Sequence, residues 1–178
     1  MNKILLFIII SIVLFFTYGI YANISKKNIK SKRVICQKQT VTFESIYNLE
    51  KISKAQKLFF SKNYKVKSSI KYSVFMPTRL KEFFDVKRAN DILQRNIYIE
   101  NIIKTDKKVL VDYYIYENDK DDKNKKHQDS KLYAGYLVFE FILDNETVYK
   151  IQTDYMKQDG SDIENRIKCV IKSFQTIK

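Results

Sequence analysis

The chain has 178 residues, a formal net charge of +13, and hydrophobic and aromatic fractions of 45% and 14%. The apolar content excludes a disordered chain, and the presence of only three glycines and one proline excludes collagen-like, linker-rich and glycine-loop architectures. The charge is +12 without residues 1–22, in which Lys3 is the only charged side chain, and it favours anionic partners, although lysines spread along the chain give the same charge without a binding surface.

Residues 1–22 predict a signal peptide or a membrane anchor. Lys3 precedes an apolar run from Ile4 to Phe16 that continues loosely to Ala22, which is the order of a secretory signal. Cleavage after Ala22 would place the bulky Ile20 at the −3 position, so the uncleaved form stays open. Roughly 19 apolar residues of helix, at about 1.5 Å each, would then cross a thin bilayer through residues 4–22.

The topology of an uncleaved segment also stays open. Lysines and an arginine follow it directly, and by the positive-inside rule they would keep the rest of the chain in the cytoplasm. A start of this shape is more often an export signal, so we expect a periplasmic protein, or one anchored in the inner membrane with its domain outside the cytoplasm. Residues 16–23 contain no cysteine, which disfavours a lipoprotein.

We expect a basic stalk over residues 23–40 and a single domain over 41–178. Apolar residues at helical spacing predict a helix over 45–62, with Thr42 as its N-cap. Alternating residues over 63–76 predict a strand, or two short strands bent near Ser68, that end at Pro77. Residues 78–96 predict a helical region in two pieces, and residues 97–104 an extended segment.

The second half predicts three strands and a helix. Residues 108–117, 132–143 and 147–156 are rich in β-branched and aromatic residues, and the last two flank the turn signal Asp144-Asn145-Glu146. After Gly160, Ser161 and Glu164 form a capping box before an apolar stripe. The whole order predicts an α+β fold, in which an antiparallel β-sheet is covered by helices on one face and a C-terminal amphipathic helix ends the chain.

The charged loop 117–131 has no core-forming residue. It contains the only histidine, His127, and four acidic residues, Asp119, Asp121, Asp122 and Asp129. A calcium loop would need glycine where Asn124 stands and glutamate where Ser130 stands, and one histidine cannot hold zinc. We therefore expect a hairpin tip, which is a candidate contact loop for a partner, and no metal.

Cys36 and Cys169 are the only cysteines. Helical spacing places Cys169 away from the apolar stripe of the last helix. In an oxidising compartment the two cysteines would form a disulfide that joins the stalk to this helix, and in a reducing one they would stay unpaired.

Many tyrosines lie in the predicted strands. Aromatic and basic residues together can bind single-stranded nucleic acid by stacking, but ordinary sheet packing also explains them and is the interpretation we favour. No glycine-rich phosphate loop, no nucleophile motif and no pairing of a nucleophile with a base occurs in the sequence. We therefore expect no enzyme and no cofactor.

Four stretches within residues 64–178 follow one another in a familiar order: KYSVFMPTRLKEF, LYAGYLVFEFIL, VYKIQTDY and DIENRIKCVIKSFQTI. This order, with its terminal helix ending in I-K-S-F, resembles the PsbP-like domains, including the DcrB-like group, of small exported bacterial proteins. The resemblance implies an α/β/α-like sandwich with an antiparallel sheet and a non-catalytic accessory role. The lipobox cysteine of those proteins is absent, residues 45–62 and 117–131 are additional, and no functional residue carries over.

These features together predict an exported, non-catalytic protein-binding domain of the bacterial cell envelope, tethered to the membrane if residues 1–22 stay uncleaved, with an accessory, assembly or toxin-immunity role. A structural subunit of a secretion or conjugation machine is one alternative, although a helix after the last strand disfavours it. A cytoplasm-facing nucleic-acid binder is another, and we do not expect nucleic acid to be the main partner.

Overall fold

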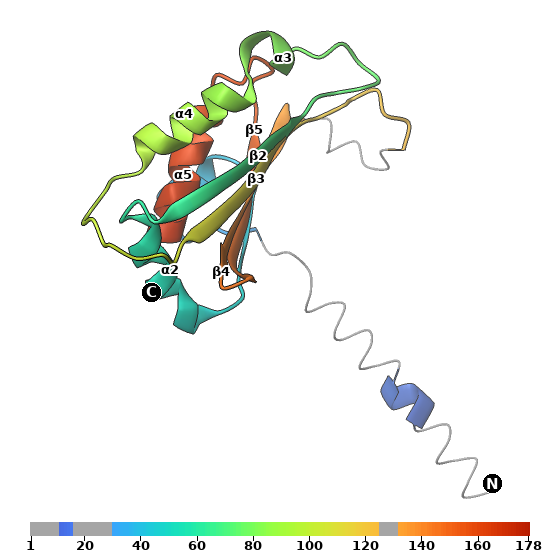
Figure 1. Cartoon of the computed structure of the whole chain (residues 1–178). Coiled ribbons are helices and arrows are strands. Elements are labelled where there is room, and N and C mark those ends of the chain that lie inside the picture. The colour runs from blue at the N-terminus through green and yellow to red at the C-terminus, as the bar shows by residue number, and fades with distance from the viewer. Residues whose placement is uncertain (1–10, 16–29, 125–131) are drawn as a thin grey trace, which may run out of the picture.

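The structure is a computed structural model that describes residues 11–15, 30–124 and 132–178 (Figure 1). Its elements, in chain order, are η1 (Ile35–Gln39), β1 (Thr42–Ile46), α2 (Leu49–Phe59), β2 (Tyr64–Lys71), α3 (Leu80–Phe83), α4 (Val86–Asn96), β3 (Val109–Glu117), β4 (Gly135–Leu143), β5 (Glu146–Tyr155) and α5 (Ile163–Gln175). The expected α+β fold is confirmed.

Most of the segment expected to be a signal or anchor lies outside the described residues. Of residues 1–22, only 11–15 are described, and they are helical and exposed. Within the described parts of the chain, no helix has both the length and the apolar content needed to cross a membrane.

The strands form one five-stranded mixed sheet in the order β1-β5-β4-β3-β2. Neighbouring strands are antiparallel except at one edge, where β2 runs parallel to β3. The expectation of a wholly antiparallel sheet is therefore wrong at this edge. The reason is the connection over residues 72–108, which contains α3 and α4, because a helical crossover returns the chain in the same direction as the strand it left.

The expected helix over 45–62 begins too early. Residues Thr42–Ile46 form β1, which pairs with β5 and places Thr42 opposite Thr153. Helix α2 starts only at Leu49, after Asn48, whose side chain accepts the backbone N–H of Lys51 at 3.1 Å. Asn48, and not Thr42, is therefore the N-cap, and the alternation before it belongs to a strand.

The other predicted elements are close to the observed ones. Residues 64–71 form a single strand, and residues 80–96 form two helices, α3 and α4. Strands β4 and β5 meet at Asp144 and Asn145, whose φ angles of 52° and 63° match the two-residue hairpin turn that favours such residues.

The predicted capping box of the last helix is not formed. The Ser161 backbone N–H donates to the side chain of Asp159, and α5 begins at Ile163 after Asp162. The Asp162 carboxylate instead accepts the backbone N–H groups of Met156 and Lys157, so it fixes the chain that leaves β5.

Helices α2, α4 and α5 lie on one face of the sheet (Figure 1). The core between the layers is aromatic: the Phe141 ring stacks on Phe174 with centroids 3.9 Å apart, and Phe59 meets both rings edge-on. Among the residues that the structure describes, no helix covers the opposite face. The fold therefore has two layers where the resemblance to PsbP-like domains implies three.

The carboxyl end of the range expected to be a stalk packs on the domain. The Ser31 backbone N–H donates to the Thr42 carbonyl, and the side chain of Gln37, which is only 1% exposed, donates to the Ser173 hydroxyl on α5. Cys36 and Cys169 form a disulfide with their Cα atoms 5.7 Å apart. Residues 30–40 are thus held to the last helix by hydrogen bonds and a covalent bond.

Candidate functional site

The face of the sheet opposite the helices, which we call the open face, carries an aromatic surface. Side chains alternate between the two faces of a strand, so every second residue points away from the core. The residues that form this surface are Phe43 on β1, Tyr114 and Tyr116 on β3, Tyr136 and Val138 on β4, and Gln152 and Asp154 on β5. Their register places Tyr116, Tyr136 and Asp154 in one row across three strands.

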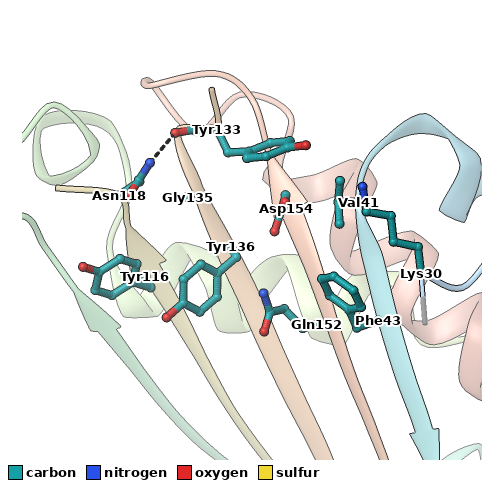
Figure 2. Close-up of a pocket in the computed structure, with 10 residues that line it drawn as sticks. All are labelled: Lys30, Val41, Phe43, Tyr116, Asn118, Tyr133, Gly135, Tyr136, Gln152 and Asp154. Carbon is teal, nitrogen blue, oxygen red and sulfur yellow. Dashed lines mark hydrogen bonds between the residues drawn. The ribbon is translucent and has the colours of Figure 1, made fainter. Parts of the chain in front are cut away.

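A cleft of about 440 Å³ opens at one end of this face (Figure 2). Its apolar walls come from Val41 and from four aromatic rings, those of Phe43, Tyr116, Tyr133 and Tyr136. Its polar groups are Lys30, Asn118, Gln152 and Asp154. A mainly apolar hollow with a few polar groups is the usual form of a ligand-binding site, so this cleft is the candidate site of the molecule.

The tyrosines of the open face pack against one another. The rings of Tyr116 and Tyr136 stack with centroids 4.9 Å apart, and Tyr114 meets Tyr136 edge-on at 6.2 Å. Burial, with the nearby phenol groups, raises the pKa of Tyr136 to about 12. The phenol of Tyr136 is therefore neutral at physiological pH and offers an O–H donor and a π-face.

Asp154 is the buried charged group of the cleft. Only 7% of the residue is exposed, and it lies beside Val41 (Figure 2). Its backbone N–H donates to the Val41 carbonyl. Burial raises the pKa of this carboxyl to about 6, although Gln152 and the positive charges of Lys30 and Arg166 partly oppose the rise. The carboxyl is mostly ionised at neutral pH, and the surrounding positive charges offset the cost of burying its negative charge only in part.

The other carboxylates of the open face do have cationic partners. Asp112 pairs with Lys67 at 2.8 Å, and Glu140 pairs with Lys150 at 2.6 Å. Over residues 30–124 and 132–178, no lysine or arginine nitrogen lies within 4.0 Å of the Asp154 carboxylate. Asp154 thus differs from its neighbours in lacking an ion pair within the described structure.

Gly135 lies at the end of the cleft, where the neighbouring groups leave no room for a side chain. A Cβ atom there would collide with the backbone carbonyl of Tyr116 and would lie 2.5 Å from the ring of Tyr155. The side chain of Tyr155 lies beneath this point, on the helix side of the sheet. No other residue type fits between these two groups without a shift of the backbone.

Beside the cleft, two carboxylates fix the loop between β2 and α3. Glu117 accepts the backbone N–H groups of Ser73, Arg79 and Leu80, and Asp119 accepts those of Val74 and Phe75. The loop is therefore well ordered by hydrogen bonds, yet it presents Val74 and Phe75 to solvent with exposed fractions of 84% and 64%.

The sequence-predicted site residues divide into three groups. Cys36 and Cys169 are brought together, as described above. Asp119 is buried and accepts hydrogen bonds from the loop that contains Val74, whereas Asp121 and Asp122 lie near the surface. His127 and Asp129 lie outside the described residues. In the part of the chain that is described, no three histidine, cysteine or acidic side chains gather to hold a metal.

The cleft and its charged group, Asp154, were not predicted from the sequence. The sequence carried no clear signal, because Asp154 continues the outward-facing polar alternation of Lys150 and Gln152, and its burial follows only from the residues that the fold brings beside it. Phe43 is hidden for a different reason: the predicted helix over 45–62, with Thr42 as its N-cap, leaves no strand there to place this ring beside β5.

Comparison with known proteins gives little further information. No family model matches the sequence, and no curated protein matches it. Among solved structures, the PelC dodecamer from Paraburkholderia phytofirmans is similar with 10% identity and a TM-score of 0.36, over 78% of this chain and 99% of that chain. A point variant of the same dodecamer gives 10% identity and a TM-score of 0.35, over 78% and 98%. Similarity at this level supports no statement about this chain.

Proposed function

We propose that the protein is an exported, non-catalytic protein-binding domain of the bacterial cell envelope, held at the membrane by its opening segment. Its binding surface is the open face with its cleft, and its role is that of an accessory, assembly or toxin-immunity protein. A relationship to PsbP-like domains belongs to the same proposal and is supported by the order of the last three strands and the terminal helix.

The observation that carries the binding role is the aromatic cleft on a sheet face with no described helix over it. Tyrosine and phenylalanine side chains on a surface supply large contact areas and are enriched at protein interfaces. Because Tyr116 and Tyr136 already pack on each other, they lose little conformational freedom when a partner binds.

Export is supported by the disulfide between Cys36 and Cys169. Disulfides persist in the periplasm and outside cells, whereas the cytoplasm keeps most thiols reduced. The apolar opening run, Ile4 to Phe16, supports the same compartment.

A cytoplasm-facing nucleic-acid binder is the second candidate, favoured by the tyrosines of the open face and by Lys71, whose Nζ lies 5.0 Å from the centroid of the Tyr114 ring. Asp112, Glu140 and Asp154 on the same face oppose it, because carboxylates repel phosphate. Titration with fluorescent oligothymidylate and oligouridylate tests this candidate, since binding to phosphates must weaken as salt rises.

Two measurements test the main proposal. A phosphatase fused to the carboxyl terminus of the full chain reports on export, and we expect it to be active. Cross-linking and capture from envelope extracts reports on binding, with Tyr136→Ala as the test variant and Tyr98→Ala, whose residue is 73% exposed and lies in the α4–β3 connection, as the control. We expect wild type and the control to recover a common partner and Tyr136→Ala to lose it. An inactive fusion refutes export, and capture that does not depend on Tyr136 refutes the binding surface.

A further inference from the structure

The buried charge of the cleft has the opposite sign to the net charge of the protein. The chain as a whole carries +13, yet the buried charged group in the cleft is the carboxylate of Asp154. Removing a carboxylate from water without a cation beside it is unfavourable. A cation supplied by a bound molecule would relieve this cost, because it would complete an ion pair that the described structure lacks.

The rings around Asp154 favour the same kind of group. Tyr136 is the register partner of Asp154, Tyr116 stacks on Tyr136, and Phe43 forms the wall on the β1 side (Figure 2). Ammonium and guanidinium groups are attracted to the faces of such rings. The same apolar walls fit the aliphatic stem that carries the charge in lysine and arginine side chains.

Lys30 is the cationic group that the cleft itself contains. It lines the cleft, it is exposed, and its charge acts on Asp154 from beyond ion-pair distance. It would therefore compete weakly with an incoming cation, whereas it would attract an incoming anion. Removing the charge of Lys30 and removing the charge of Asp154 should therefore change the affinity for a cationic ligand in opposite directions, and the same holds for an anionic ligand.

We propose that the cleft receives a lysine or arginine side chain of a partner protein, with the cationic head beside Asp154 and the stem between Phe43 on one side and the stacked rings of Tyr116 and Tyr136 on the other. This inference rests on the proposed role as a protein-binding domain, and it names the chemistry that the partner must present. The partner surface is accordingly basic, even though the net charge of this chain alone would suggest an acidic one.

Peptides with one variable residue test this inference. The full chain is purified in detergent micelles, and the amide signals of Gly135 and Tyr136 are followed by NMR. The probes are acetyl-Ala-Ala-X-Ala-Ala-amide peptides in which X is lysine, arginine, norleucine or glutamate. We expect saturable shifts with lysine and arginine, binding at least fivefold weaker with norleucine, and none with glutamate.

Two variants with opposite expected effects sharpen the test. Asp154→Asn keeps the size of the side chain and removes its charge, so it should weaken binding of the lysine peptide by at least tenfold. Lys30→Gln removes the internal competitor and should leave binding equal or up to severalfold tighter. The reverse pattern, with Lys30→Gln weakening a glutamate peptide or an oligonucleotide and Asp154→Asn strengthening it, overturns the proposal in favour of an anionic ligand.

A replacement variant and three further outcomes distinguish a folding defect, a free amine ligand and a failure of either proposal. If Asp154→Asn does not fold, Tyr136→Leu takes its place, with an expected loss of at least threefold for the lysine peptide over the norleucine peptide. If n-butylamine binds as tightly as the lysine peptide, the ligand is a free amine and the assignment to a partner protein is wrong. Peptide binding by a protein that fails the export assay would refute the proposed function alone. Capture through Tyr136 without any peptide binding would refute this inference alone.

Discussion

The Glu117 carboxylate accepts the backbone N–H of Leu80 at 2.9 Å, across 37 residues of chain. The same carboxylate accepts the backbone N–H groups of Ser73 and Arg79 and the hydroxyl of Thr78. Burial alone would raise the pKa of Glu117, but these hydrogen bonds outweigh it and hold the pKa below its usual value. The ionised carboxylate of Glu117 therefore holds several backbone groups of the loop next to the cleft, together with Asp119.

Glu117→Gln tests this role. In the variant the amide NH₂, which is a donor, would face backbone N–H groups that donate to the carboxylate in the wild type, so some of these groups would lose their acceptor. We expect a loss of about 3 kcal/mol in unfolding free energy, measured by urea denaturation. Asp112→Asn is the control, because it removes only the solvent-exposed pair with Lys67, and we expect it to cause a much smaller loss. Similar losses for the two variants would contradict the structural role of Glu117. Since the folded pKa of Glu117 is lowered, its contribution is present above the unfolded pKa and is lost as the pH falls through the folded value.

Asp154→Asn should make the protein more stable at neutral pH. The folded pKa of Asp154 is raised to about 6 from 3.8, so its ionisation on raising the pH through this range opposes folding. The penalty is fully present above the folded pKa, reaches at most about 3 kcal/mol, and disappears below the unfolded pKa. We therefore expect the difference in unfolding free energy between Asp154→Asn and wild type to grow between pH 4 and pH 7. A difference that does not change with pH would show that Asp154 is not buried as described.

The disulfide should contribute strongly to stability. It closes a loop with a sequence separation of 133, for which the chain-entropy model gives about 5 kcal/mol as an upper value. We expect tris(2-carboxyethyl)phosphine to lower the urea midpoint of wild type and to leave that of the double variant Cys36→Ala, Cys169→Ala unchanged. Equal midpoints for oxidised wild type and the double variant would show that the bond adds nothing to folding.

Gly135→Ala and Gly160→Ala should differ in severity. At Gly135 the added Cβ meets a backbone carbonyl that cannot move away, and we expect a loss of more than about 3 kcal/mol or a failure to fold. At Gly160 the φ angle of 68° makes alanine strained, and the nearest atom is a flexible Leu80 methyl group, so a loss of about 1–2 kcal/mol is expected. Thermal unfolding of both variants measures the order, and a milder effect at Gly135 would contradict the packing described at the end of the cleft.

The parts of the fold set by local chemistry were predictable from sequence. The β-branched and aromatic content of residues 108–117, 132–143 and 147–156, with the turn at Asp144 and Asn145, predicts β3, β4 and β5. The parallel pairing of β2 was missed, although the order strand, helices, strand over residues 64–117 is the usual sign of a crossover. Strand β1 was missed because its short sequence, TFESI, gains stability mainly from pairing with β5, which is more than 100 residues away. The cleft combines side chains of β1, β3, β4 and β5, so it could not be assembled before that pairing was known.

The bond between Cys36 and Cys169 also determines how the domain responds to mechanical load. A pull applied at the amino-terminal side first meets the contacts of residues 30–35, such as the hydrogen bond of Ser31 to Thr42. Once these give way, the tension passes through the covalent link into α5, whose inner face is packed against the sheet. The edge strand β1 is then not peeled from β5 one pair at a time, and the force is borne by a helix that is anchored in the core of the domain.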